Sequence, residues 1–370
     1  MERMIPGPRL VAVSVMVSLG VLSGCSAADG TADGMRSPAT SATAPTSGSP
    51  ASSSSPQSPA SGAPSATPST APSEAPVPEA ASRVSIPALM TKRYDGGGLR
   101  LGRVLLRTSD YTRRTVSYRS GDLRISGILN LPHGRGPFPV LVLLHGHIDT
   151  SIYVTGQGLM REQDYLARRG YAVLHTDYRN HASSDDDPSA ERSLRLGYTE
   201  DTVNAVLAVR ESGIARLDGE RVGLLGRSMG GGVTYNTLVA QPGLVKAAVV
   251  FAPVSSRTKD NFNRWIRGER SELAAEIVAR HGSPEGNPRF WREVSPRTYF
   301  DRVTEPILIH HGTSDDSCPI RWTRATYDAL RDNGKAAKLF VYDGEEHAFG
   351  PQWPLSMQRT VRFLDRHLGV

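Results

Sequence analysis

The chain has 370 residues, a formal net charge of +6 and only two cysteines, and it is long enough for one large domain or two ordinary ones. Its positive charge comes from arginines scattered along the sequence. No run of basic residues alternates with aromatic ones, so nucleic acid is not expected as a partner. Two cysteines cannot build a disulfide framework, and the stability of the fold must therefore come from a packed core.

The first residues have the pattern of a secretory signal. Arg3 and Arg9 precede an uncharged apolar run over residues 10–22, which is too short to span a bilayer. The run leads into Leu22-Ser23-Gly24-Cys25, which resembles the lipobox of bacterial lipoproteins, where the cysteine is lipidated and becomes the new N-terminus. We expect residues 1–24 to be a lipoprotein signal peptide and Cys25 to anchor the protein to the outer face of the bacterial cell membrane. The alternative is an ordinary signal peptide with an incidental cysteine, and hence a secreted protein.

A long stretch of small residues and prolines follows, over residues 25–81. It contains hardly any large apolar side chain, so it cannot bury enough surface to offset the entropy that folding would cost. We expect a disordered tether there, kept extended by its prolines, with membrane contact through the lipid alone. The remaining residues, 82–370, have an ordinary globular composition and are predicted to form one large domain.

Within this domain, short apolar runs alternate with longer segments of helical spacing. The apolar runs lie at 140–144, 171–174, 222–225, 247–251, 307–309 and 339–342. Helical spacing occurs at 198–209, 327–330 and 357–368, and the runs 115–118 and 123–131 predict an antiparallel hairpin. Continuous apolar runs are typical of strands buried on both faces. The alternation therefore predicts an α/β fold, with a mostly parallel central sheet and helices on both faces.

Residues 255–300 interrupt this alternation. They contain no strand pattern, two short helical pieces, and the large apolar residues Phe262, Trp265, Phe290 and Trp291. A long insertion between two strands is usually functional, and open α/β sheets bind ligands beyond the carboxyl ends of their strands. We predict a small helical lid there, with Trp265 and Trp291 in a substrate pocket. The alternative is that these aromatic residues only pack the lid onto the domain.

The clearest chemical motif is Gly226-Arg227-Ser228-Met229-Gly230, a G-x-S-x-G sequence between the predicted strand 222–225 and an apolar-periodic segment at 233–239. Its glycines are needed because the chain must turn sharply from strand to helix, which exposes the serine at the edge of the sheet. We predict Ser228 as a nucleophile. The backbone N–H of Met229 would then face the negative charge that develops on the substrate.

A serine hydroxyl needs a neighbouring histidine to accept its proton, and an acid to orient that histidine. In strand–turn–helix hydrolases the acid and the histidine follow the serine in that order along the chain. Two loops that follow predicted strands carry such residues. They are His311-Gly312-Thr313-Ser314-Asp315-Asp316-Ser317-Cys318-Pro319 and Asp343-Gly344-Glu345-Glu346-His347.

These two loops resemble the catalytic domain of the prolyl oligopeptidase (S9) family and its esterase relatives, which have the α/β-hydrolase fold. The family pattern reads His-Gly-x-x-Asp-x-x-Val-Pro and then Gly-x-x-His, and the resemblance spans about residues 116–370. It implies Asp315 as the acid and His347 as the base, with Asp316 as the rival acid. Cys318 stands where valine is usual, and it is expected to alter only the packing.

The resemblance extends to the segment His145-Gly146-His147, which ends the predicted strand 140–144. It implies that the backbone N–H of His147, or that of Ile148, is the second donor of an oxyanion hole. The imidazole of His145 would be a buried structural group that hydrogen-bonds the loop.

A further segment, 177–183, is similar to the Asp-x-Arg-Gly-x-Gly-x-Ser stretch of the same family. Asn180 and Ala182 stand where that stretch has glycines, which leaves the course of this loop open.

The residues in and near this segment also raise the question of a metal site. Two groups of possible ligands occur, namely His175, Asp177 and His181, and His310, His311 and Asp315. Neither has the spacing of a zinc motif, so no metal and no other cofactor is expected.

Together these residues predict an exported serine hydrolase that cleaves a peptide or a small ester through an acyl-enzyme. An S9-type peptidase and a carboxylesterase remain open alternatives. Full-length prolyl oligopeptidases carry a propeller domain that filters substrates, whereas a predicted tether precedes the domain of this chain. A third alternative, from a different class, is a surface binding protein that has the hydrolase fold without catalysis.

Overall fold

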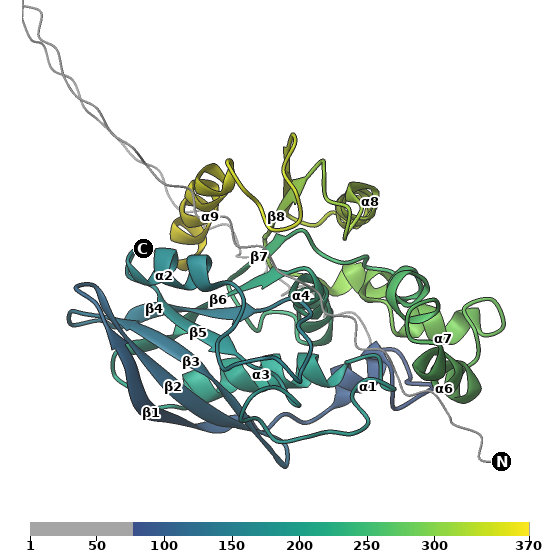
Figure 1. Cartoon of the computed structure of the whole chain (residues 1–370), viewed down its shortest axis with the longest axis horizontal. Helices are drawn as coiled ribbons and strands as arrows, with labels where there is room; N and C mark the ends of the chain where they lie inside the picture. Colours follow the sequence, from purple (N-terminus) through teal and green to yellow (C-terminus); the bar gives the residue numbers. More distant parts are fainter. Residues whose placement is uncertain (1–76, 370) are drawn as a thin grey trace, which may run out of the picture. The chain divides into compact units, whose positions relative to one another are not determined.

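The computed structural model describes residues 77–369, which fold around one mixed sheet (Figure 1). The strands are β1 (Gly97–Arg107), β2 (Tyr111–Ser120), β3 (Leu123–Pro132), β4 (Phe138–Leu144), β5 (Ala172–Thr176), β6 (Leu217–Arg227), β7 (Ala247–Phe251), β8 (Ile307–Gly312) and β9 (Ala337–Tyr342). The predicted signal peptide, Cys25 and all of the predicted tether except residues 77–81 lie outside the described residues.

The strands are hydrogen-bonded in the order β1-β2-β3-β5-β4-β6-β7-β8-β9. Strands β1, β2 and β3 pair antiparallel, and β3 also pairs antiparallel with β5. The strands from β4 to β9 are parallel to one another. The predicted fold class, with a mostly parallel sheet, is therefore confirmed, and all six predicted parallel strands are present.

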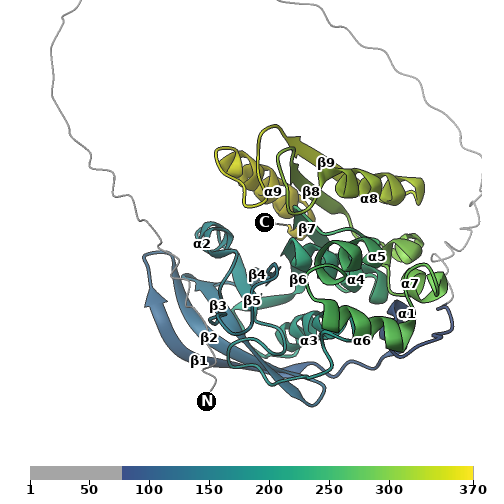
Figure 2. The same ribbon diagram turned by 45° about the vertical axis from the view of Figure 1, so that its right-hand side comes forward.

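Helices cover both faces of the sheet, as Figures 1 and 2 show. The α-helices are α1 (Ile86–Thr91), α2 (Met160–Ala167), α3 (Gly197–Arg210), α4 (Met229–Ala240), α5 (Thr258–Asn261), α6 (Ser271–His281), α7 (Pro288–Glu293), α8 (Ile320–Asp332) and α9 (Trp353–Leu368). A π-helix, η1 (Phe262–Ile266), and a 3₁₀ helix, η2 (Pro296–Arg302), complete the set. Helices α2 and α9 lie on one face, and α1, α3 and α4 lie on the other. Within residues 77–369, no helix combines the length and apolarity that a membrane span requires.

The central strand β4 shows why its sequence is a continuous apolar run. Val140, Val142 and Leu144 belong to the core on the side of α3 and α4, whereas Leu141 and Leu143 belong to the core on the side of α2 and α9. All five side chains are fully buried, because successive residues of a strand point to opposite faces and both faces are covered.

The edge strand β1 was not predicted. Most of its residues are exposed, and its pairing with β2 is interrupted by several register shifts. Its sequence alternates only at Leu99-Arg100-Leu101 and then runs through Val104-Leu105-Leu106, so it lacks the sustained alternation of apolar and polar residues that marks a half-buried strand. The neighbouring hairpin was predicted, and it is confirmed by the antiparallel pairing of Ser120 with Leu123.

The insertion at 255–300 is helical, as predicted, and contains more pieces than the two expected. It comprises α5, η1, α6 and α7, and it runs into η2. The structure therefore gives this insertion the form of a helical cap, with helices packed on one another and on α4.

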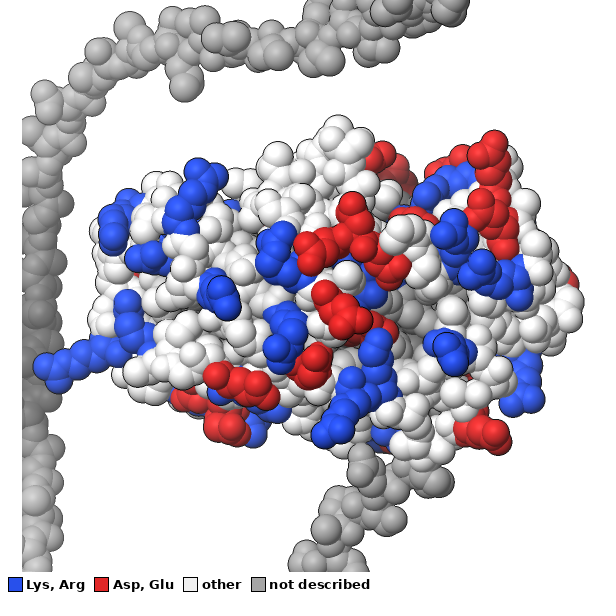
Figure 3. All heavy atoms as spheres, turned by 90° about the horizontal axis from the view of Figure 1, so that it is seen from below, with Lys and Arg blue, Asp and Glu red and all other residues white. Residues whose placement is uncertain are grey.

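Charged side chains are spread over the face of the molecule that Figure 3 shows. On the face shown in Figure 3, lysines and arginines lie singly among uncharged residues, or beside acidic ones. The positive charge of this face is therefore not gathered into one continuous basic stripe.

Candidate active site

Ser228 sits at the sharp turn between β6 and α4. Its backbone has φ 55° and ψ −119°, a conformation in the left-handed half of the map that L-residues seldom adopt. A Cβ on Gly226 would lie 2.3 Å from the carbonyl oxygen of Gly230, and a Cβ on Gly230 would lie 2.0 Å from that of Leu144. Glycine is therefore required at both positions of the motif, and the tight turn leaves Ser228 facing a cavity.

Asp315 and His347 are brought together from the loops that follow β8 and β9. The Nδ1 of His347 lies 2.9 Å from the Oδ2 of Asp315. The Asp315 side chain is fully buried, whereas the His347 side chain is 26% exposed and lines the same cavity as Ser228. The rival acid, Asp316, is exposed, and its carboxylate makes no hydrogen bond to His347 within the described residues.

The Asp315 carboxylate is held in its ionised form. Burial acts to raise its pKa, but hydrogen bonds from His311, His347 and the Cys318 backbone N–H together lower the pKa well below the ordinary range. A permanently ionised acid suits the stabilisation of a histidine that becomes positively charged during a reaction.

The Ser228 hydroxyl makes no hydrogen bond to His347 in the described part of the chain. Its Oγ makes one polar side-chain contact among the described residues, at 3.9 Å from the Sγ of Cys318. Serine–histidine hydrogen bonds are often long or absent in enzymes without substrate, and they tighten in the substrate complex. Burial raises the pKa of the Cys318 thiol to about 12, so the thiol stays neutral and is a poor nucleophile.

Two backbone N–H groups are available beside Ser228. Met229 is the first residue of α4, and His147 follows Gly146 in the loop after β4; both line the cavity. Neither N–H donates to another backbone group within the described residues. Ile148 lines the cavity as well, so either residue of this loop can supply the second donor. The His145 ring is buried and lies 2.6 Å from the Gly146 carbonyl oxygen, as expected of a group that supports the loop.

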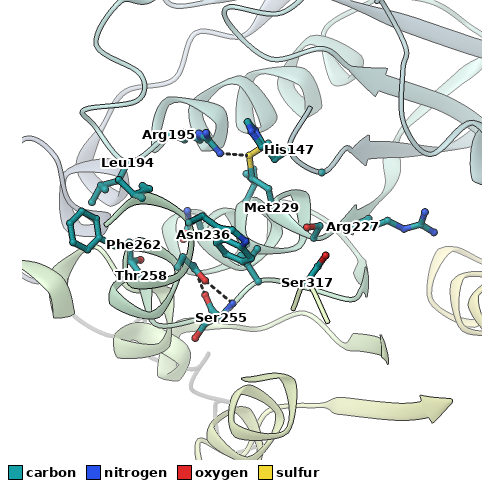
Figure 4. A pocket seen from close by; sticks show the side chains of 18 of the residues that line it. His147, Leu194, Arg195, Arg227, Met229, Asn236, Ser255, Thr258, Phe262 and Ser317 are labelled. Atoms are coloured by element: carbon teal, nitrogen blue, oxygen red, sulfur yellow. Dashed lines mark hydrogen bonds between the residues drawn. The ribbon is translucent and has the colours of Figure 1, made fainter. Parts of the chain in front are cut away.

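The cavity has a volume of about 540 Å³, and apolar and polar residues both line it, with apolar atoms forming the larger part of the surface (Figure 4). The apolar residues include Leu194, Leu196, Val233, Val254, Phe262, Trp265, Ile266 and Val294. The helical insertion therefore supplies a large part of the wall, through α5, η1 and the residues around them.

The two tryptophans of the predicted pocket lie in different places. Trp265 lines the cavity and makes an edge-on contact with Trp322, with ring centroids 5.6 Å apart. Trp291 does not line it. Its ring packs behind Phe262, at 4.7 Å between centroids, and its indole N–H donates to the Gly282 carbonyl. The structure therefore gives Trp265 a place in the wall and Trp291 a place behind it, where it packs the insertion together.

Charged residues at the cavity were not predicted from the sequence. Glu191 accepts hydrogen bonds from Arg195 at 2.9 Å and from Arg270 at 2.8 Å. Burial opposes ionisation of Glu191, but these two arginines lower its pKa below the ordinary value. Figure 4 shows Arg195 pointing toward the sulfur of Met229, at 3.3 Å. Isolated arginines and glutamates carry no sequence signal, so only the fold reveals this cluster.

The loop at 177–183 keeps the backbone that glycines would favour. Asn180 has φ 65° and Ala182 has φ 51°, both in the left-handed region. Hydrogen bonds between the Asn180 side chain and the backbone of Asp187 hold this conformation. Both residues therefore have the left-handed backbone conformation that glycine adopts most readily.

Comparison with known proteins identifies the family to which the sequence is similar. The sequence model of the prolyl oligopeptidase family matches residues 157–370, which is more than half of the chain. The chain is 28% identical over 243 residues to the Bacillus subtilis protein named uncharacterized peptidase YuxL, covering 63% of this chain and 35% of that one. It is 26% identical over 250 residues to the rat acylamino-acid-releasing enzyme, covering 64% of this chain and 32% of the enzyme.

Among solved structures, acetyl xylan esterase 1 of a Thermoanaerobacterium species superposes with a TM-score of 0.53 at 18% identity, covering 73% of this chain and 88% of the esterase. This likeness shows the shared fold. The chain spans about a third of the length of the two curated relatives above.

Proposed function

Because the chain belongs to the prolyl oligopeptidase family and is therefore an S9-family serine hydrolase, we propose that Ser228 is its nucleophile, His347 its base and Asp315 its acid. One observation carries this assignment. His347 donates from Nδ1 to the buried Asp315 carboxylate at 2.9 Å, while its ring and the strained Ser228 line one cavity.

The reaction follows from these positions. A rotation of the Ser228 side chain brings its hydroxyl to His347, which accepts the proton as the oxygen attacks a carbonyl carbon. Asp315 keeps the His347 proton on Nδ1 and stabilises the imidazolium that forms. The N–H groups of Met229 and of His147 or Ile148 donate to the oxyanion. His347 then protonates the leaving group, and water, activated by the same histidine, releases the acyl group from Ser228.

Peptides are the first candidate substrates. The family match supports this choice, as do the two relatives, which are named as a peptidase and as an acylamino-acid-releasing enzyme. The apolar cavity suits a large apolar side chain or acyl group next to the bond that is cleaved.

Small or acyl esters are the second candidate. The apolar wall would accept an acyl chain equally well, and the superposition on an esterase covers most of that esterase's length. Purified protein assayed against aminoacyl p-nitroanilides and p-nitrophenyl esters would separate the two classes. Hydrolysis of neither, together with no labelling by a fluorophosphonate, would instead favour a binding protein without catalysis.

We also propose that the protein is exported and attached to the outer face of the membrane through a lipid on Cys25. The sequence Leu22-Ser23-Gly24-Cys25 behind a basic start and an apolar run supports this proposal. A lipid there would keep the hydrolase at the cell surface, where peptides or esters outside the cell are accessible.

A further inference from the structure

A buried hydrogen-bond chain lies behind Asp315, and the reaction as described above makes no use of it. His311 is the next-to-last residue of β8, and its Nε2 lies 2.8 Å from the carbonyl oxygen of Cys318 and 3.2 Å from the Oδ2 of Asp315. The Nδ1 of His311 lies 2.7 Å from the Oγ1 of Thr323, in the first turn of α8. His311 and Thr323 are both buried.

The surroundings of His311 determine where its protons must be. A carbonyl oxygen and a carboxylate oxygen are acceptors only, so the Nε2 that faces both must carry a proton. In the neutral ring Nδ1 then has a lone pair, to which the Thr323 hydroxyl can donate. The other neutral tautomer would turn a lone pair on Nε2 toward two acceptor oxygens in a site closed to water. The two acceptor oxygens therefore select the tautomer in which His311 carries its proton on Nε2, and the Thr323 hydroxyl holds the ring in place by donating to Nδ1.

We propose that Thr323 and His311 are positioning residues for catalysis: Thr323 holds the His311 ring in its orientation through Nδ1, and His311 holds the Asp315 carboxylate in place for His347. The inference rests on the proposed function, because it assumes that Asp315 and His347 act as acid and base. Metal-binding proteins use the same principle, in which a second group orients a ligating histidine through its other nitrogen.

The contacts of Asp315 show what His311 contributes. Its Oδ2 accepts the N–H of His347 at 2.9 Å, and the Nε2 of His311, which also faces the Cys318 carbonyl, lies 3.2 Å from the same oxygen. Its Oδ1 receives the backbone N–H of Cys318 at 2.8 Å. These three donors come from three places in the chain, and together they fix the plane of the carboxylate. Without His311, the Oδ2 would keep only the N–H of His347, so the carboxylate would be held less firmly and its interaction with a protonated His347 would become stronger.

The Thr323 hydroxyl can be tested with a matched pair of variants. Thr323→Val removes the hydroxyl and keeps the shape, whereas Thr323→Ser keeps the hydroxyl. We expect Thr323→Val to lower kcat roughly tenfold, because loss of a hydrogen bond to a buried group leaves that group unsatisfied, and to leave KM unchanged. We expect Thr323→Ser to retain most of the kcat. Equal kcat for the two variants, both with the wild-type melting temperature, would overturn the role of Thr323.

The donor on His311 is tested with His311→Leu and His311→Gln. The amide N–H of glutamine can reach the region of Nε2 and donate, whereas leucine cannot. We expect His311→Leu to lower kcat on the order of 10-fold to 100-fold, with the acid limb of the kcat/KM profile moved to higher pH, because a less restrained Asp315 binds the protonated His347 more tightly. His311→Gln should recover part of the kcat. A folded His311→Leu with wild-type kcat and pH profile would overturn the proposal, and if neither His311 variant folds, the Thr323 pair decides.

A Ser228→Ala variant measured beside these four separates the two proposals. Activity that survives Ser228→Ala would overturn the nucleophile assignment, and the positioning role with it. Activity that is lost in Ser228→Ala but unchanged in Thr323→Val and His311→Leu would overturn the positioning role alone.

Discussion

The backbone at Ser228 has φ 55° and ψ −119°, and such a conformation costs roughly 1–3 kcal/mol at a residue other than glycine. The sequence could predict this strain, because Gly226 and Gly230 mark a turn in which a side chain would collide with backbone oxygens. The orientation of the serine hydroxyl could not be predicted. It faces the Cys318 thiol at 3.9 Å, and Cys318 lies 90 residues further along the chain.

We propose Asp315 as the acid that orients His347, and a matched pair of variants tests this assignment. Asp315→Asn should lower kcat on the order of 10⁴-fold, because an amide favours the wrong tautomer of the base histidine. Asp316→Asn should leave kcat close to the wild-type value, because Asp316 is exposed and His347 donates to Asp315. Steady-state kinetics on one chromogenic substrate would compare the two. If Asp316→Asn were the inactive variant, Asp315 would not be the acid.

His311 shows the limit of motif reasoning at this scale. The His-Gly pair at 311–312 is visible in the sequence. The proposed positioning role of His311, however, depends on its contact with Thr323, which α8 places against the end of β8. A short motif lists residue types at fixed spacing, whereas this contact depends on the path of the loop between a strand and a helix.

At the scale of elements, the strands that are buried on both faces were predictable, and the exposed or polar elements were not. Strand β4 is a continuous apolar run because two cores meet there. Strand β1 is mostly exposed, and helix α2 is mostly polar, so neither has the apolar periodicity that predicts an element. The helical character of the insertion was predictable from the absence of a strand pattern, but the order of its helices was not.

The insertion also gives an element-scale prediction, since its two tryptophans have different places. Trp265→Ala should change the preference between short and long acyl esters several-fold, because Trp265 lines the cavity and each methylene in an apolar pocket is worth ~1–3 kcal/mol. Trp291→Ala should instead lower the free energy of unfolding by about 3–5 kcal/mol, because its ring is buried behind Phe262. Esterase assays with a thermal melt would measure both. Equal slowing of all substrates by Trp265→Ala, together with a lower melting temperature, would show that the insertion does not select substrates.

For the molecule as a whole, the buried histidines determine how stability depends on pH. Burial lowers the pKa of His145 and of His310 to about 3, and it also lowers the pKa of His175 well below its ordinary value. The unfolded chain therefore binds protons near pH 6.5 that the folded protein does not bind. The free energy of unfolding should fall by about 1.4 kcal/mol per pH unit for each such histidine as the pH drops from 6.5 toward 3.

Denaturant titrations between pH 7 and pH 5 would measure this slope. A His310→Gln variant should show a smaller slope, by about one proton. His133→Gln is the matched control for the substitution itself, because it replaces an exposed histidine and leaves all the buried ones in place. Stability that stays constant over this range would mean that the buried histidines are not kept neutral by the fold.

The proposed lipid anchor also concerns the whole molecule, and it depends on one residue outside the described part of the chain. A Cys25→Ser variant should lose partitioning into the detergent phase, because the hydroxyl of serine cannot replace the thiol that receives the lipid. Its hydrolytic activity should be retained, since Ser228, His347 and Asp315 lie far along the chain in the folded domain. Unchanged partitioning of Cys25→Ser would contradict the lipidation proposal.

The central claim is that Ser228 attacks the substrate, with His347 as the base and Asp315 as the acid. Locating a covalent adduct tests this claim most directly. The full chain would be treated with a fluorophosphonate, digested, and analysed by mass spectrometry, beside Ser228→Ala as the control. The account predicts one adduct, on the peptide that contains Ser228, and no adduct or hydrolysis in Ser228→Ala, since loss of a triad serine costs on the order of 10⁶ in kcat. An adduct on another residue, or wild-type hydrolysis by Ser228→Ala, would contradict it.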